Sequence, residues 1–372
     1  MYHFKLFIKL IIFLPIAILI LKLFRLFYKT DQKYTKKNIV FFQRNQHDST
    51  NDAGARTVVE LREALSEKID TVTVEISWFE ISFYKKLNTS NFCFVRTPED
   101  AVILCALKLI MFKKCSILYY GGDIHYNRLL SKISHDGKSI KNILQYFYYI
   151  ILEPLVWKAS YCNFSPSYEE VHTIKDINKN SFLLPVRLFF NYPEKYEKNT
   201  HDKMLFLFVG GLGHLPNKDA LQYIDEEIID AYLEAFGDNF EILVVGRGWD
   251  KFEGKYVGQN LKFLGSVSDA ELENLYQMVD FTLCPLRFGA GVKGKVIESM
   301  YYNVPVITTS IGKQGINCEY LVSNEDIQSQ INYIKKLKDD EHLLERTIEG
   351  YSDFLRKNYS GTKTRDIIMD LL

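Results

Sequence analysis

The chain has no excess of charge of either sign, and it lacks the sequence patterns of several common classes of binding protein. Lysine plus arginine and aspartate plus glutamate both number 46. Without a net positive field, nothing draws in a polyanion over long range, which argues against bulk nucleic-acid binding. No internal repeat or low-complexity segment stands out, so there is no sign of a repeat architecture.

Cysteine pairs of the CxxC type are also missing, which argues against a zinc site. The six cysteines are scattered along the chain, at Cys93, Cys105, Cys115, Cys162, Cys284 and Cys318. Most of them lie in apolar, strand-like runs. This placement predicts buried thiols in a reducing compartment.

The longest hydrophobic run is shorter than an ordinary membrane span. Leu10 to Leu21 carries no charge, and Leu6 to Tyr28 reaches spanning length only if its basic side chains extend to the interface. No small-residue cleavage site follows, so we expect residues 1–30 to be a retained membrane anchor, single-span or monotopic, rather than a cleaved signal. Basic residues after the run outnumber those before it. The positive-inside rule therefore predicts that the rest of the chain is cytoplasmic.

At 372 residues the chain is too long for one ordinary core, and two domains are expected. Strand-like and helix-like segments alternate from Asn38 onward, which predicts α/β domains with parallel sheets. The predicted strands are Asn38–Gln43, Thr71–Ile76, Phe92–Arg96, Ser116–Tyr120, Tyr161–Ser165, Phe182–Val186, Met204–Val209, Glu241–Val245 and Leu261–Leu264. The predicted helices include Thr57–Leu65, Ile140–Ser160, Asp219–Phe236 and one opened by a capping box at Ser268 and Glu271. The polar stretch Asn191–Lys203 separates a first domain, 38–190, from a second, 204–345. Residues 346–372 are expected to pack back on the first.

The segment Phe281 to Ile316 combines a buried strand, a glycine-rich turn, a helix and a second strand. Glycines in the turn, Gly291 among them, allow a ligand to approach the backbone, and the helix directs free amides toward it. Lys293 and Lys295 add positive charge, and Glu298 lies one helical turn beyond Lys295, where it can accept hydrogen bonds from sugar hydroxyls. Solvated surface lysines are the plain alternative. The combination favours a nucleotide-sugar site.

This segment resembles the donor-binding signature of the group 1 glycosyl transferases, glycosyltransferase family 4. The resemblance, which covers most of Met204 to Ile316, implies the glycosyltransferase B architecture of two Rossmann-like domains. It also implies that Glu298 binds the donor ribose and that Lys295 sits at the diphosphate. Many members have a glutamate near the transferred sugar where this chain has Ala290.

Two further loops of the second domain fit the same resemblance. Gly210 and Gly211, in LFVGGLGHLPNKDAL, look like the phosphate loop, although many relatives have arginine in place of Gly211. His214 or Lys218 would then supply the charge. In VVGRGWD, Arg247 either stacks on the base or is simply exposed. Neither loop has the spacing of a dinucleotide fingerprint.

Two loops of the first domain are candidates for binding the substrates. In DAGAR, Gly54 would let an acceptor or the donor diphosphate approach the backbone, and Asp52 would also serve as an ordinary helix cap. GGDIHYNRL follows a predicted strand, where ligands of parallel sheets gather, and resembles the DxHxxR stretch of related transferases. We therefore predict that His125 contacts the transferred sugar and that Asp123 lies on the acceptor side. A structural histidine is the plain alternative.

The resemblance implies transfer of a sugar from a nucleotide-diphosphate sugar with retention of configuration. No metal or other cofactor is expected, because lysine and helix amides stabilise the departing diphosphate and no DxD motif is present. The anchor and the aromatic Ile140–Trp157 region favour a glycan or lipid-linked acceptor, in polysaccharide or lipopolysaccharide assembly. The alternatives are a nucleotide-sugar epimerase of the same fold and an inactive fold member that acts as a membrane scaffold.

Overall fold

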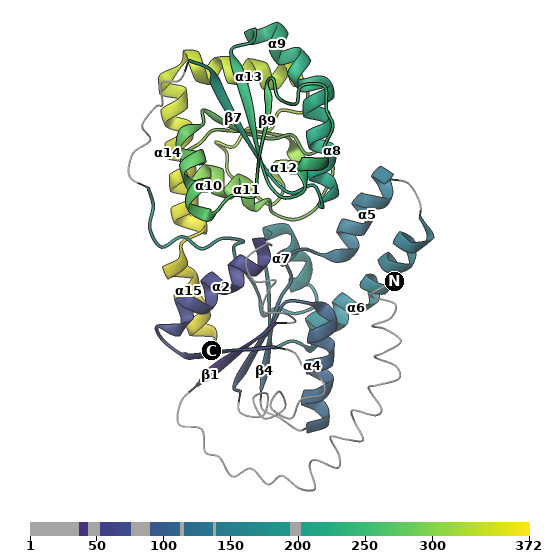
Figure 1. Cartoon of the computed structure of the whole chain (residues 1–372). Coiled ribbons are helices and arrows are strands. Elements are labelled where there is room, and N and C mark those ends of the chain that lie inside the picture. Colours follow the sequence, from purple (N-terminus) through teal and green to yellow (C-terminus); the bar gives the residue numbers. More distant parts are fainter. Residues whose placement is uncertain (1–36, 44–52, 76–89, 112–114, 137–138, 194–201) are drawn as a thin grey trace.

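The computed structural model describes residues 37–43, 53–75, 90–111, 115–136, 139–193 and 202–372. In these residues the chain forms two α/β domains, each built on one parallel sheet (Figure 1). The predicted fold class of two Rossmann-like domains is therefore confirmed.

The first domain is a sheet of six parallel strands in the order β2-β1-β3-β4-β5-β6. The strands are β1 (Asn38–Gln43), β2 (Asp70–Glu75), β3 (Phe92–Val95), β4 (Ser116–Tyr120), β5 (Cys162–Ser165) and β6 (Ser181–Leu183). The helices are α2 (Ala53–Ser66), α4 (Pro98–Met111), α5 (His125–Asp136), α6 (Ile140–Ala159) and α7 (Tyr168–Lys175). Every residue of β3 and β5 is buried, because helices cover both faces of the sheet.

The second domain is a five-stranded parallel sheet in the order β11-β10-β7-β8-β9. The strands are β7 (Met204–Val209), β8 (Phe240–Val245), β9 (Leu261–Gly265), β10 (Phe281–Cys284) and β11 (Val306–Thr308). The helical segments are α8 (Leu215–Tyr223), a π-turn (Ile224–Ile228), α9 (Ile229–Phe236), a 3-10 turn (Trp249–Lys251), α10 (Asp269–Met278), α11 (Gly294–Tyr301), α12 (Ser310–Lys313) and α13 (Ile327–Asp339). Aromatic rings fill much of the core, where Phe206 packs on Phe281, Tyr232 and Phe240.

The last two helices join the domains. α14 (Glu341–Asn358) packs against α11 and α13 in the second domain, whereas α15 (Gly361–Leu371) packs against α2 in the first (Figure 1). Between them the chain passes beside the outgoing connection. The Phe189 amide donates to the Tyr359 carbonyl at 2.9 Å, and the Gly361 amide donates to the Phe189 carbonyl at 2.8 Å. The two crossings between the domains are therefore hydrogen-bonded to each other.

The element boundaries depart from the predicted ones where proline is involved. The helix predicted to begin at Asp219 begins at Leu215, since Pro216 occupies its first turn, where no amide donor is needed. The strand predicted as Phe182–Val186 ends at Leu183, and Pro185 just beyond it has no amide to donate to a ladder. The capping box at Ser268 and Glu271 is confirmed.

The predicted anchor, residues 1–30, lies outside the described residues, as does Asp52. In the part of the chain that is described, no helix combines the length and the apolar character needed to cross a membrane. All six cysteines are free and buried, as predicted.

Candidate active site

Hydrogen bonds from Lys293 stabilise the glycine turn between β10 and α11. Gly289 and Gly291 have φ angles of 139° and 74°, which residues other than glycine rarely adopt. The Lys293 ammonium donates to the carbonyl oxygens of Gly291 at 2.6 Å and Ala290 at 3.3 Å. Burial lowers the pKa of Lys293 to about 8. Lys293 therefore shapes the turn as well as adding charge to it.

Lys295, the second residue of α11, is partly buried. Its ammonium donates to Asn217 Oδ1 at 2.8 Å and lies 4.8 Å from the centroid of the Phe208 ring. Asn217 Nδ2 in turn donates to the Gly211 carbonyl at 3.1 Å. Burial lowers the pKa of Lys295, since a buried ammonium has no water to solvate it. Lys295 thus connects α11 with the loop that follows β7.

The loops after β7 and β8 lie against each other. A methyl group added to Gly246 would approach the Gly210 carbonyl oxygen to 2.2 Å, and Trp249 Nε1 donates to the same oxygen at 2.6 Å. The Leu212 amide donates to the Arg247 carbonyl at 3.0 Å, while the Arg247 side chain is exposed. The structure therefore brings Gly210, Gly211 and Arg247 together at the carboxyl edge of the second sheet.

His214, one of the two residues expected to replace a missing arginine charge, begins α8. Desolvation first and Lys295 second lower the pKa of His214 below its ordinary value. The ring is therefore neutral at pH 7. Lys218 is exposed on the first turn of α8.

Glu298 is shared between the two domains. Its Oε1 accepts from Arg187 and, at 3.5 Å, from Arg56 on α2, while Tyr276 donates to its Oε2 at 3.4 Å. Arg56 also pairs with Asp269 at 2.5 Å, and Arg187 pairs with Glu60 at 2.8 Å. A ribose diol at Glu298 would therefore have to share this carboxylate with two arginines.

The loop between β4 and α5 meets the glycine turn across the domain boundary. A methyl group added to Gly291 would lie 3.2 Å from Asp123 Cβ, and Ser131 Oγ donates to the Gly289 carbonyl at 3.4 Å. Asp123 itself accepts from Arg128 at 3.1 Å. Asp123 and Gly291, predicted from motifs about 170 residues apart, are thus neighbours.

His125 is the first residue of α5, and its ring is held on two sides. Its Nδ1 lies 2.8 Å from Glu153 Oε1, and the ring stacks on Tyr149 with 4.6 Å between centroids. The backbone amide of His125 donates to the same Glu153 oxygen at 3.0 Å. Since a carboxylate only accepts, Nδ1 carries a hydrogen. In the neutral ring Nε2 is then the acceptor.

A second buried carboxylate supports the same loop. Glu170 on α7 accepts from the Ile124 amide at 3.0 Å and from Ser165 Oγ at 2.6 Å. Burial raises the pKa of Glu170 to about 7. The beginning of α5 is therefore fixed by Glu153 and Glu170, two acids whose partners are already in place.

Gly54 lies in the first turn of α2, one turn before Thr57, whose hydroxyl donates to the Val186 carbonyl. Sequence reasoning missed three site residues, Arg56, Glu153 and Arg187. Only Glu153 had a visible signal, as the one acidic residue of helix α6. The arginines act across the domain boundary, which no local pattern reveals.

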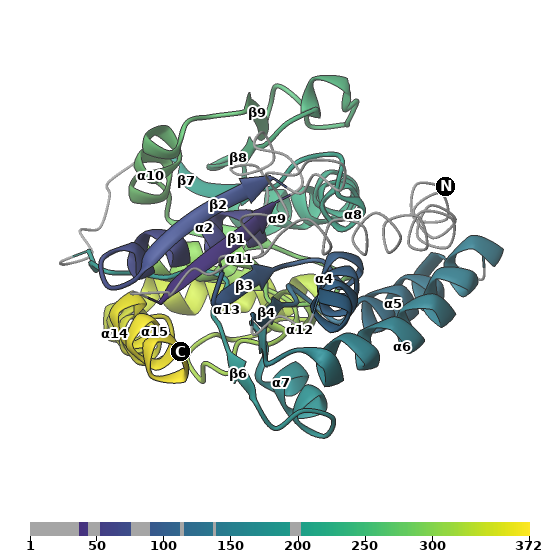
Figure 2. The ribbon, with the colours of Figure 1, turned by 90° about the horizontal axis from the view of Figure 1, so that it is seen from below.

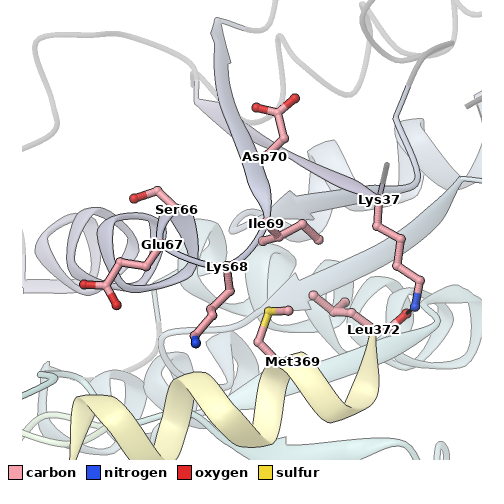
Figure 3. A pocket seen from close by; sticks show the side chains of 8 residues that line it. All are labelled: Lys37, Ser66, Glu67, Lys68, Ile69, Asp70, Met369 and Leu372. Atoms are coloured by element: carbon pink, nitrogen blue, oxygen red, sulfur yellow. Dashed lines mark hydrogen bonds between the residues drawn. The ribbon is translucent and has the colours of Figure 1, made fainter. Parts of the chain in front are cut away.

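A hollow of about 730 Å³ lies elsewhere, beside α2 and α15 (Figure 3). Its lining includes Lys37 and Asp70, which stand at the amino ends of β1 and β2. Ligands of parallel α/β sheets bind at the carboxyl ends of strands, so this hollow is at the wrong edge for the chemistry. In the described residues no group of three or more His, Cys, Asp or Glu side chains could hold a metal ion.

Known proteins resemble this chain in both sequence and fold. Residues 203–340 match the family model of the glycosyl transferases group 1. An uncharacterized protein in the cps region of Klebsiella pneumoniae is 23% identical over 271 residues, which span 69% of this chain and 66% of that protein, just under two thirds of its length.

Two solved structures share the fold over nearly the whole chain. Anabaena HepE in complex with UDP and glucose has a TM-score of 0.63 at 11% identity, covering 90% of this chain and 98% of HepE. Sucrose-phosphate synthase from Thermosynechococcus elongatus has a TM-score of 0.64 at 14% identity, with the same coverage of 90% and 98%. At these sequence identities, both comparisons show that the fold is shared and nothing more. Residues 203–340, which include Lys295 and the glycine turn, therefore form a domain that is similar to the glycosyl transferases group 1.

Proposed function

We propose that the protein is a retaining glycosyltransferase of family 4 that moves a sugar from a nucleotide-diphosphate sugar to a glycan or lipid-linked acceptor. One observation carries the proposal. The glycine turn above Lys295 in the second domain lies directly against the loop of Asp123 and His125 in the first. A donor diphosphate at the turn would therefore present its sugar to residues of both domains.

The chemistry follows from the charges around the turn. The free amides that begin α11 and the ammonium of Lys295 would stabilise the negative charge that develops on the departing diphosphate. Neither group needs a divalent ion, so we propose that turnover requires none. Nε2 of His125 would accept a hydrogen bond from a hydroxyl of the transferred sugar when the ring is neutral, or donate one to the leaving oxygen when the ring is an imidazolium.

A panel of nucleotide sugars tests the donor site. UDP-glucose is the first candidate, because HepE was solved with UDP and glucose. We expect one member of the panel to raise the melting temperature, since a ligand that binds only the folded state stabilises it. Glu298→Gln should weaken that binding about tenfold, by loss of a charged acceptor for the ribose.

Arg187 keeps Glu60 as an ion-pair partner in the Glu298→Gln variant, so the variant is expected to fold. Lys336→Met, at an exposed position of α13, is the matched control and should bind like the wild type. The absence of a thermal shift with every nucleotide sugar would reject the proposed donor site.

We also propose that the enzyme works at the cytoplasmic face of a membrane, in surface polysaccharide assembly. The basic residues that follow Leu21 support this orientation, and a relative in a cps region supports the role. A C-terminal fusion to a reporter that is active only outside the cytoplasm should be inactive, and a cytoplasmic reporter at the same place should be active. The reverse pattern would contradict the orientation and the cytoplasmic donor supply.

An epimerase remains the second candidate, because acidic and histidine side chains do gather near Gly291. Two of the acids argue against it, since Glu170 and Glu153 already accept from the backbone amides of Ile124 and His125. Incubation with a nucleotide sugar in the absence of an acceptor distinguishes the two. An epimerase converts the donor to its epimer, whereas a transferase returns it unchanged or slowly hydrolysed. A scaffold would leave the donor unchanged both with and without an acceptor.

A further inference from the structure

Helix α6 buries one face and exposes another that is apolar from Ile140 to Leu155. The buried face carries Tyr149, Glu153 and Trp157. The exposed face, named here the α6 stripe, consists of Ile140, Leu144, Phe147, Ile151 and Leu155. Each of these residues is between 56% and 78% exposed. Their spacing of four, three, four and four residues places them on one side of the helix.

The α6 stripe is a contiguous apolar surface rather than a set of isolated exposed residues. Of the sixteen large hydrophobic side chains exposed in the described residues, six lie on α6, the five of the stripe and Ile150. At 1.5 Å per residue the stripe is about 22 Å long. Figures 1 and 2 show α5 and α6 extending as a pair along one side of the first domain, away from the sheet. Contiguous apolar surface of this kind marks a binding face.

The charges around the stripe favour a lipid surface over a second copy of the chain. The exposed charged residues of α6 are Lys141 and Lys158, near its two ends, and its one acid, Glu153, is buried. Two copies of α6 packed together would bring no carboxylate to these lysines, whereas paired helices commonly match charges at their flanks. Anionic headgroups would pair with both lysines while the stripe enters the apolar layer.

We propose that the α6 stripe is a membrane-docking surface that lies in the interface of a bilayer containing anionic lipid. The opposite face of the same helix holds His125 through Glu153 and Tyr149. Docking would therefore place His125 about one helix diameter, roughly 10–12 Å, from the headgroups. This consequence for a lipid-linked acceptor rests on the proposed transferase function. The docking itself does not depend on it.

The test places a fluorescent label on the stripe of the full chain in vesicles of phosphatidylcholine and phosphatidylglycerol. Phe147→Cys can be labelled selectively, because the six native cysteines are buried. The control label is at Glu349→Cys, an exposed position on α14 in the second domain. We expect nitroxide-bearing lipids to quench most of the emission at position 147, and iodide in the water to quench little of it. The control should show the opposite.

Three results would overturn the proposal. If iodide quenches the label at position 147 as much as it quenches the control label, the stripe remains exposed to water. A label shielded from both quenchers shows a stripe covered by protein, either a second copy or the chain's own residues 10–21. Equal lipid quenching after adding Leu144→Ser and Ile151→Ser shows that the stripe is not what inserts. Leu264→Ser with Ile367→Ser, which replaces two exposed apolar residues elsewhere, is the matched control.

Measuring donor binding distinguishes failure of the docking proposal from failure of the proposed function. The stripe variants should keep the wild-type melting shift with the nucleotide sugar, because their side chains point away from the site. If lipid quenching fails while that shift persists, only the docking surface is wrong. If no nucleotide sugar binds while lipid quenching persists, only the proposed donor site is wrong.

Discussion

Lys295→Met is expected to lower kcat by about 10²- to 10³-fold, the loss seen when one preorganised donor to a developing negative charge is removed. The lysine is partly buried and desolvation lowers its pKa, so its charge would be better stabilised with a diphosphate bound beside it. Methionine keeps the length and the apolar contact with Phe208 while removing the charge. The affinity for the donor should fall much less than the rate, because the leaving group becomes more negative in the transition state.

Single-turnover rates and donor affinities of wild type, Lys295→Met and the exposed control Lys336→Met would measure this effect. The hydrogen bond to Asn217 is lost in the variant, so its melting temperature must be compared with that of the wild type. A folded Lys295→Met protein with wild-type turnover would show that the diphosphate is bound elsewhere.

His125→Ala is expected to lower transfer by about fivefold to a hundredfold, corresponding to the ~1–3 kcal/mol lost when a hydrogen-bonding group is left without its partner. The effect should appear in turnover more than in donor affinity, because the bond to the sugar or leaving group strengthens in the transition state. Glu153 is a positioning residue in this account, since it fixes the ring through Nδ1 and leaves Nε2 to face the substrate.

The competing structural role makes a different prediction for the same variant. If His125 only anchors α5 to α6, the alanine variant should lose melting temperature, and whatever remains folded should transfer normally. His172→Ala, an exposed histidine on α7, is the control for loss of a histidine. A destabilised His125→Ala protein with full single-turnover activity would refute the catalytic assignment.

The fold was predictable because apolar runs and turn residues are local. β1, β4 and β7 begin and end where the alternation of apolar segments places them, and strands alternate with helices in both domains. The glycine turn and Lys295 were predictable for the same reason. The backbone amides, the glycines and the lysine all lie in one short segment, so a local pattern is enough to reveal them.

The rest of the site was not predictable, because it is formed by residues far apart in the sequence. Arg187 and Arg56 meet Glu298 only after both domains have folded, and nothing near either arginine signals a carboxylate partner. Glu153 has the same property. Its partner, His125, lies 28 residues earlier on another helix, and only the packing of α5 on α6 brings them together.

The backbone contact between Phe189 and the segment Tyr359 to Gly361 restricts how the two domains can move. A chain that crosses once between two bodies leaves them free to slide, twist and separate. Two crossings bonded to each other leave one pivot, so the remaining freedom is rotation about that point. Groups near the pivot, such as Arg187, should barely change their distance to the second domain, whereas groups far from it sweep a wide arc. A movement of one domain against the other is then a swing about a fixed hinge, and the ion pairs nearest the hinge can stay intact while the far side opens.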